Sequence, residues 1–375
     1  MISPAAIKAH LRVRVRRELR RRRQHQNGRN ALLRSKGRSA VDAYVRDIRR
    51  YWADNYGKRI DVGGHLNFTA ITGVEDVRFI PDHIWRDEIV PMLNPLHLRP
   101  AFRDKNLGDV LLTLDGRAPS TVMRRVRGHY FTGNGREVSR DEAWQRIRDA
   151  TADGDLIAKP SNSDNGQGIT LLTTDRDDDA HEGLVQTLAR LESRLGSDYI
   201  VQTRIVQHDR LSEMHPASVN TLRMVTLRWE RKIQHLGTFV RFGTEERIND
   251  NAGSGGIVVG VDQEGRLNSM GIAGLGSRLY RHPVSGLAFK DLVIPGWNAF
   301  PRFVEELHKQ ILHFDLISWD IAVAPDASPM FLEMNFKGSG YRYQWALGHG
   351  ILAEFSAPML NRVRGQRHSA GHVPT

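Results

Sequence analysis

The sequence predicts a mixed α+β fold in which the middle and C-terminal segments are rich in strands. Segments with apolar residues at three- and four-residue spacings, typical of amphipathic helices, alternate with short runs typical of strands. Glycine, proline and asparagine separate these segments, as expected at turns and at helix ends. Of the 375 residues 40% are hydrophobic, which is enough for one large core or for several subdomains.

The basic residues are unevenly distributed along the chain. The formal net charge is +11, and the stretch from Leu11 to Arg23, LRVRVRRELRRRR, contains eight arginines. Such a run is found in proteins that bind nucleic acid, an anionic membrane surface or a polyanionic substrate, and equally in solvated helices that pack on their own protein. No aromatic residue lies within the run to stack on bases. An anionic partner is therefore one alternative, and charge alone gives no function.

Several protein classes are excluded by composition. The chain has no cysteine, so disulfides and thiolate metal sites are ruled out. No apolar run approaches the ~18–20 residues that a membrane-spanning helix needs. The first basic residues are not followed by the apolar stretch of a secretory signal. We therefore expect a soluble, cytoplasmic protein.

The elements can be assigned in order along the chain. Residues 1–38 are expected to be a basic, Arg-rich segment that is helical or partly disordered, and 40–52 an amphipathic helix with Val41, Tyr44 and Ile48 at helical spacing. Later helices are expected over 182–195, which Gly196 closes as a C-cap, and over 299–312. Strands are expected on both sides of a loop at 161–168 and over 198–206, 221–229, 233–244, 316–324 and 329–336, with a hairpin over 255–267.

Two of these strands carry polar side chains that are costly to bury without a partner. Glu333 and Asn335 point to the same side of their strand, because strand residues alternate between faces. The turn at 325–328 folds the preceding strand back antiparallel and can bring Asp320 beside them. Two carboxylates and an amide oxygen suit Mg²⁺, which takes its remaining ligands from water and phosphates. We predict a metal site at these three residues; ordinary surface or edge contacts are the alternative.

A magnesium site of this kind implies a phosphate donor, and two further patterns fit one. Lys159 ends a strand and is followed by the loop 161–168, whose glycines allow backbone amides to wrap phosphate oxygens. The loop is neither a Walker nor a Rossmann motif, and a plain hairpin connection is the alternative. Arg223, three residues after Asn220, can neutralise phosphate charge, with an exposed cross-strand ion pair as the alternative.

Taken in chain order, Lys159, the glycine loop, Asn220 with Arg223, and the Asp320, Glu333-x-Asn335 set resemble the ATP-grasp superfamily. The segments 201–227 and 316–340 are most similar to its sugar-transfer-associated branch, and the likeness runs from about Leu98 to Gly350. The resemblance implies an ATP-grasp fold, in which two α+β subdomains clasp ATP. It places the small (lid) subdomain at 119–206 and the large subdomain with the metal site at 207–365. Before them it places the basic segment 1–38 and a smaller N-terminal domain at 39–118, and after them a tail at 366–375.

The resemblance also implies which residues hold the nucleotide. Lys105 matches the family's first lysine and Lys159 its second, while residues 161–168 match the mobile lid over the β- and γ-phosphates. Residues 200–203 match the strand that binds adenine, with Gln202 where many members have Glu. The implied nucleotide contacts are Lys105, Lys159, Ser161, Asn165, Gly166, Gly168, Gln202, Ile205, Asp209, Asn220 and Arg223. Glu213 is the alternative to Asp209 as the ribose-binding acid.

The chemistry that the resemblance implies is ligation of a carboxylate to an amine, with ATP and Mg²⁺ as cofactors and Mn²⁺ as an expected substitute. The carboxylate attacks ATP to give an acyl phosphate, which an amine then attacks to form an amide or peptide-like bond. Lys159 and Arg223 would be the catalytic residues, and closure of the loop would exclude water. The alternatives are phosphate transfer to a small metabolite without ligation, and polyanion binding through the arginine run.

The small-molecule acid and amine would lie beside the γ-phosphate. Candidate residues for binding them are Arg241, Arg247, Lys337 and Arg342, each of which could equally be a solvated turn or packing residue. His208 and His215 could serve as a base, although a lone histidine beside a strand is more often structural. The sequence predicts neither the substrates nor the oligomeric state.

Overall fold

The computed structural model describes residues 4–163, 168–173, 182–244, 256–274, 276–338 and 340–370. The chain folds into two compact units. The first comprises Met1–Met92, Gly276–Arg278 and Ser339–Thr375, and the second comprises Leu93–Leu275 and Leu279–Gly338. No helix among the described residues is long and apolar enough to cross a membrane.

The first unit is built around one long, kinked helix, α1 (Pro4–Tyr56). Gly37 interrupts it with a φ of 80°, a left-handed angle that glycine adopts without a side-chain clash. The part of α1 after the kink contains the helix predicted at 40–52, and it buries Val41, Tyr44 and Trp52. The other helices are α2 (Gly63–Thr72), α3 (Asp82–Ile84), the π-helix η1 (Trp85–Ile89), α4 (Val90–Leu93), α11 (Gly340–Leu347), η4 (Ala353–Phe355) and α12 (Ser356–Ala370).

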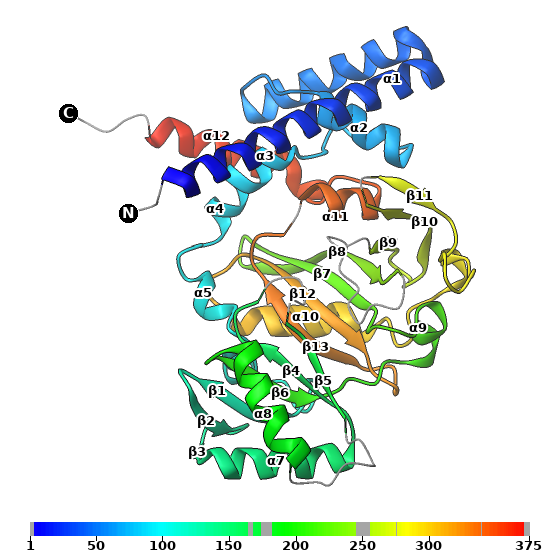
Figure 1. The fold of residues 1–375 in the computed structure, drawn as a ribbon. Coiled ribbons are helices and arrows are strands. Elements are labelled where there is room, and N and C mark those ends of the chain that lie inside the picture. The colour runs from blue at the N-terminus through cyan, green and yellow to red at the C-terminus, as the bar shows by residue number, and fades with distance from the viewer. Residues whose placement is uncertain are drawn as a thin grey trace, which may run out of the picture. The chain divides into compact units, whose positions relative to one another are not determined.

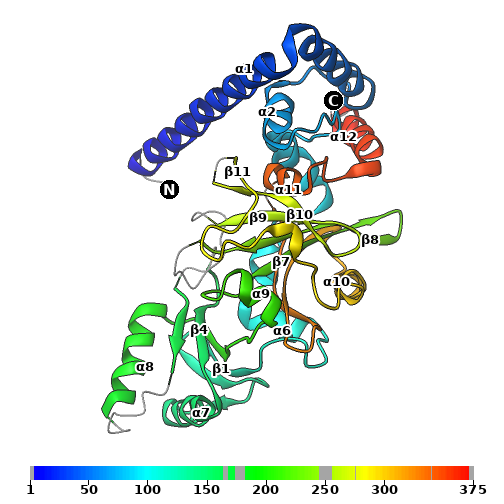
Figure 2. The same ribbon diagram turned by 90° about the vertical axis from the view of Figure 1, so that its right-hand side faces the viewer.

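The second unit contains two antiparallel sheets (Figure 1). The smaller sheet has the strand order β3-β2-β1-β6-β4-β5. Its strands are β1 (Thr121–Val126), β2 (His129–Thr132), β3 (Glu137–Val138), β4 (Leu156–Pro160), β5 (Thr170–Leu172) and β6 (Tyr199–Thr203), and its helices are α7 (Arg140–Asp153) and α8 (Glu182–Leu195). Both helices lie along this sheet (Figure 2).

The larger sheet runs β10-β9-β8-β7-β12-β13 within this unit. Its strands are β7 (Thr221–Trp229), β8 (Lys232–Phe242), β9 (Ile257–Val261), β10 (Leu267–Ala273), β12 (Leu316–Val323) and β13 (Pro329–Asn335). Of the short strand β11 (Ser277–Leu279), Ser277 and Arg278 belong to the first unit and Leu279 to the second. The associated helices are α9 (Asp209–Met214), η3 (Phe289–Asp291) and α10 (Ala299–Gln310). The α+β fold predicted from the sequence is confirmed.

Each sheet has an apolar face and a polar face, because side chains alternate along a strand. In the smaller sheet Ala158 and Val201 join the core beneath the helices, so Lys159 and Gln202 lie on the opposite face. In the larger sheet Trp319 and Ile321 join the core with α10, so Asp320 lies on the opposite face. The two polar faces therefore carry Lys159 and Asp320, one on each sheet.

Two features fix the strands that carry these charges. The buried side chain of Asn94 donates to the carbonyls of Leu316 and Phe336 at 2.8 and 2.9 Å, joining the start of β12 to the end of β13. The helices α5 (Arg99–Phe102) and α6 (Lys105–Leu111) follow, and α6 contacts both β6 of the smaller sheet and β13 of the larger one. Helix α6 thus joins the two sheets.

Candidate active site

A buried ion cluster lies on the polar face of the larger sheet. Asp320, 2% exposed, forms a two-pronged ion pair with Arg223, whose Nε contacts Oδ1 and whose Nη2 lies 2.9 Å from Oδ2. Arg241 adds a second guanidinium 3.2 Å from Oδ2 and also donates to the Thr221 hydroxyl at 2.6 and 2.8 Å. Burial alone would raise the pKa of Asp320, but the two guanidiniums outweigh it and hold that pKa below its usual value.

The predicted metal residues lie together around Asp320. Glu333 is directly opposite Asp320 in the strand register, and Asn335 Nδ2 lies 3.5 Å from Asp320 Oδ2 and 3.3 Å from Glu333 Oε1. Burial, reinforced by the neighbouring Asp320 charge, raises the pKa of the Glu333 carboxyl. This crowding of two carboxyl groups on one polar face is what a divalent cation would relieve.

The donor set fits Mg²⁺ but does not enclose it. No group of three acidic or histidine side chains that could hold a metal occurs in the described ranges. A magnesium ion would therefore depend on the two carboxylates, on the amide oxygen of Asn335 after a half-turn of that amide, and on oxygens from water or a ligand. An open site of this kind suits an ion that arrives with phosphates.

Two lysines face this cluster from the smaller sheet and α6. Burial and the charge of Lys105 lower the pKa of Lys159 to about 8, while Glu333 and Asp109 act in the opposite direction. The charge of Lys105 in turn lowers the pKa of Glu333, although burial and Asp320 outweigh it. The site thus gathers two lysines and two arginines around carboxylates that are already paired or crowded, which favours an anionic ligand.

The two lysines are joined by hydrogen bonds between α6 and the loop after β4. The backbone N–H of Lys105 donates to Ser161 O at 3.0 Å, and its Nζ donates to Ser163 O at 3.0 Å. Asp104 caps α6 through the N–H of Asn106 at 2.9 Å and accepts from Asn162 Nδ2 at 3.3 Å. One carboxylate therefore positions the helix that carries Lys105 and the loop that follows Lys159.

A second network of hydrogen bonds and ion pairs joins α6 to the smaller sheet. Arg124, 5% exposed, pairs with Asp109 at 2.6 Å and donates to Asn106 O at 2.7 Å. The Thr121 hydroxyl also donates to Asp109, at 2.7 Å, and accepts from Gln202 Nε2 at 3.2 Å. The predicted adenine-strand residue Gln202 is thus tied to the helix that presents Lys105.

The other predicted nucleotide residues fall in different environments. Asn220 is fully buried, and its Nδ2 donates to Gln207 Oε1, to Leu211 O and to His215 O, so it holds α9 in place. Asp209 is exposed in the first turn of α9, and Ile205 is half-buried. Glu213, the alternative to Asp209, is paired with Arg210 at 2.5 Å.

The glycine loop is only partly described. Ser161 is fully buried, and no described residue bonds its hydroxyl. Gly168 has a φ of 79°, and a Cβ there would lie 2.7 Å from Pro160 Cγ, so this position requires glycine. Asn165 and Gly166 lie outside the described residues.

Of the predicted substrate residues, Arg241 lies in the site, as described above. Lys337 is exposed just beyond β13, in the same unit. Arg342 belongs to the first unit, where its Nε donates to the Tyr341 hydroxyl at 3.2 Å, and Arg247 lies outside the described residues. Both candidate bases make structural contacts: His208 Nδ1 caps α9, and buried His215 lies 3.1 Å from the Ser218 hydroxyl.

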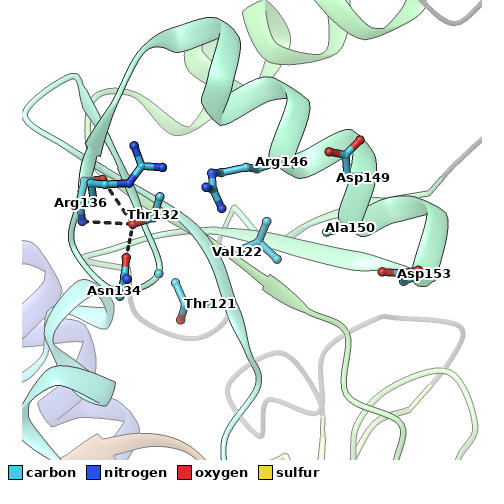
Figure 3. A pocket seen from close by; sticks show the side chains of 10 residues that line it. Thr121, Val122, Thr132, Asn134, Arg136, Arg146, Asp149, Ala150 and Asp153 are labelled. Carbon is cyan, nitrogen blue, oxygen red and sulfur yellow. Dashed lines mark hydrogen bonds between the residues drawn. The ribbon is translucent and has the colours of Figure 1, made fainter.

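A separate hollow of about 540 Å³ lies in the smaller sheet's subdomain (Figure 3). It is lined by Thr121 and Val122 of β1, by the turn after β2 and by one side of α7. Its two arginines, Arg136 and Arg146, share the Glu142 carboxylate, which offsets one of their two positive charges. None of the residues predicted to bind nucleotide, metal or substrate lines it.

Sequence reasoning missed the residues that position the lysines. Asp104 could have been found, because an Asp directly before a helix start is a typical N-cap. Arg124 could not, because its partners, Asp109 and Asn106 O on α6 and Gly133 O after β2, lie on two segments that only the fold brings to it.

Comparison with known families identifies one match. The family model described as sugar-transfer associated ATP-grasp matches residues 85–358. No curated protein sequence matches the chain significantly.

Solved structures resemble the chain at low identity. The biotin carboxylase domain of 2-oxoglutarate carboxylase from Hydrogenobacter thermophilus is 12% identical with a TM-score of 0.41, and the match covers 70% of this chain and 45% of that one. D-alanine–D-alanine ligase from Coxiella burnetii is 9% identical with a TM-score of 0.37, covering 72% and 60%. L-amino acid ligase from Bacillus licheniformis is 10% identical with a TM-score of 0.37, covering 69% and 48%. The chain thus spans about half to three-fifths of their lengths.

The lowered pKa of Lys159 gives a test that needs no ligand. Competitive acylation followed by peptide mass spectrometry should show Lys159 becoming reactive with a midpoint at pH about 8, because only the neutral amine reacts. Lys105→Met should move this midpoint upwards, since it removes a like charge, whereas Lys309→Met on the exposed side of α10 should not. A midpoint near that of an ordinary lysine in all three proteins would contradict the described environment.

Proposed function

The chain belongs to the sugar-transfer associated ATP-grasp family, and from that premise we propose that it is an ATP- and Mg²⁺-dependent ligase that joins a carboxylate to an amine. The observation that carries the proposal is that Lys105 of α6 and Lys159 of the smaller sheet gather at one site with two arginines and the Asp320, Glu333 and Asn335 set of the larger sheet. Four cations beside paired carboxylates match the charge of a triphosphate better than that of a neutral ligand.

Different residues would bind the phosphates and the metal ion of the nucleotide. Lys105 and Lys159 would bind phosphate oxygens from the smaller sheet and α6, because a compact ammonium suits a phosphate as a point charge. Of the remaining implied contacts, Ser161, Gly168, Gln202, Ile205 and Asp209 stay proposals, whereas for Asn220 we propose a structural role. Asp320, Glu333 and Asn335 would hold Mg²⁺, which supplies Lewis-acid stabilisation of phosphate charge when bound.

The proposed reaction has two steps. An oxygen of the substrate carboxylate attacks the γ-phosphorus, the bond to the bridging oxygen breaks, and ADP leaves with that electron pair. Arg223 and Arg241, which lie beside Asp320 in the site, would spread the charge that develops on the transferring group. An amine then attacks the acyl carbon of the acyl phosphate, releases phosphate and loses a proton, leaving an amide.

The experiment that tests ligation measures ADP release with panels of acids and amines. We expect the purified chain to release ADP only when Mg²⁺, a carboxylate and an amine are all present, with one amide formed per ADP. Arg223→Lys should lower the rate by about 10²-fold or more, because one point charge replaces a planar two-pronged donor. ADP release that needs only one acceptor, with a phosphorylated product, would replace ligation by phosphate transfer.

The contact between Asp104 and Asn162 gives a second test. Asp104→Asn keeps the helix cap but loses the acceptor for Asn162, and Asn162→Asp sets two carboxylates against each other. Each should weaken affinity for a fluorescent ATP analogue by about 2- to 10-fold, the range of a single hydrogen bond.

The double variant Asp104→Asn/Asn162→Asp serves as the internal control for that test. It restores a donor and an acceptor in exchanged positions, so we expect affinity close to that of the original chain. If the double variant is instead weakened as much as the two single variants combined, the contact does not position the lysines.

A further inference from the structure

Charge is segregated between the two units of the chain. The first unit holds 25 lysines and arginines against 11 aspartates and glutamates, a net charge of +14, whereas the second holds 29 against 32, a net charge of −3. The whole excess of positive charge therefore lies outside the unit that contains the candidate active site. Binding one nucleotide does not account for it.

The excess is concentrated on helix α1. We name residues 4–36, before the break at Gly37, the basic arm; at 1.5 Å per residue it is about 50 Å long. It includes the eight arginines between Leu11 and Arg23. This length of continuous helix is far more than one phosphate site needs, and it suits an extended anionic surface.

Most of the described arginines of α1 have no carboxylate partner among the described residues. Six of them are exposed and pair with no carboxylate in the part of the chain that the structure describes; they are Arg23, Arg29, Arg34, Arg38, Arg46 and Arg49. Lys36 and Arg50, by contrast, each have an acidic neighbour, at 2.7 and 4.0 Å. Unpaired guanidiniums favour phosphate, which they bind through two parallel hydrogen bonds.

The sequence of the basic arm favours a membrane over a nucleic acid as its anionic partner. Positions 7, 11, 15 and 19 are Ile, Leu, Val and Leu, and residues four apart lie on nearly the same side of a helix. An aliphatic row between arginines is typical of helices that lie in a membrane surface. Proteins that bind single strands commonly stack bases on aromatic residues, and no Phe, Tyr or Trp occurs before Tyr44.

We propose that the basic arm binds the surface of a lipid bilayer with anionic phosphate headgroups and so holds the protein at a membrane. The arginines bind the headgroups, and the aliphatic row enters the outer edge of the acyl layer.

Vesicle flotation of the full chain tests this proposal. The chain should float with phosphatidylcholine vesicles that contain about 30% phosphatidylglycerol, and not with phosphatidylcholine alone. Raising the salt from about 50 to about 500 mM should release most of it, because screening shortens the range of the attraction.

Two variants and a matched control separate the contributions. Changing Arg20, Arg21, Arg22 and Arg23 to Gln should lower vesicle binding by about tenfold or more while keeping helix propensity. Leu11→Gln with Leu19→Gln should also lower it, because the aliphatic row is broken. Removing four exposed charges from the second unit (Arg231, Lys232, Lys290 and Arg302 to Gln) should leave it unchanged, and all three proteins should keep the helical circular dichroism and ATP-analogue affinity of the original chain.

A parallel binding measurement with duplex DNA and RNA tests the alternative partner. Tight binding of duplex DNA or RNA that survives Leu11→Gln with Leu19→Gln, together with no preference for anionic vesicles, would overturn the membrane proposal. Vesicle binding that the four arginine changes do not reduce would overturn it as well.

Discussion

One buried carboxylate organises the polar face of the larger sheet. Asp320 is held by Arg223 from β7 and by Arg241 from β8, and Glu333 of β13 lies directly across from it. Removing one partner of a buried ion pair of this kind costs about 3–5 kcal/mol, because a charge is left without compensation. The cluster therefore fixes the positions of three strands relative to one another as well as the charges that they present.

The second constraint is that each sheet must bury one face. The helices cover the faces that carry Ala158, Val201, Trp319 and Ile321, so Lys159 and Asp320 lie on the opposite faces. Helix α6 contacts both β6 and β13, and its first residue, Lys105, is bonded to the loop that follows Lys159. Two sheets formed by successive stretches of the chain thereby contribute cations and carboxylates to one site.

The sequence was sufficient for the parts that depend on strand periodicity. Asp320, Glu333 and Asn335 could be placed on one face because alternation and a short turn determine their side, and the structure brings them together. The spacing of Arg241 did not reveal that it pairs with Asp320, since that contact depends on the register of β7 and β8. Asn220 lies three residues before Arg223, yet its fully buried side chain bonds α9, a contact that only the packing reveals.

We propose that this cluster binds a nucleotide together with Mg²⁺. Its most direct test is calorimetric titration of a non-hydrolysable ATP analogue into the full chain, with and without Mg²⁺, using Glu333→Gln, Lys159→Ala and the control Asp326→Asn in the exposed β12–β13 turn. We expect magnesium-dependent binding that Glu333→Gln and Lys159→Ala weaken by about tenfold or more and that the control leaves intact. No binding by the folded chain, or equal binding by all the variants, would contradict the account.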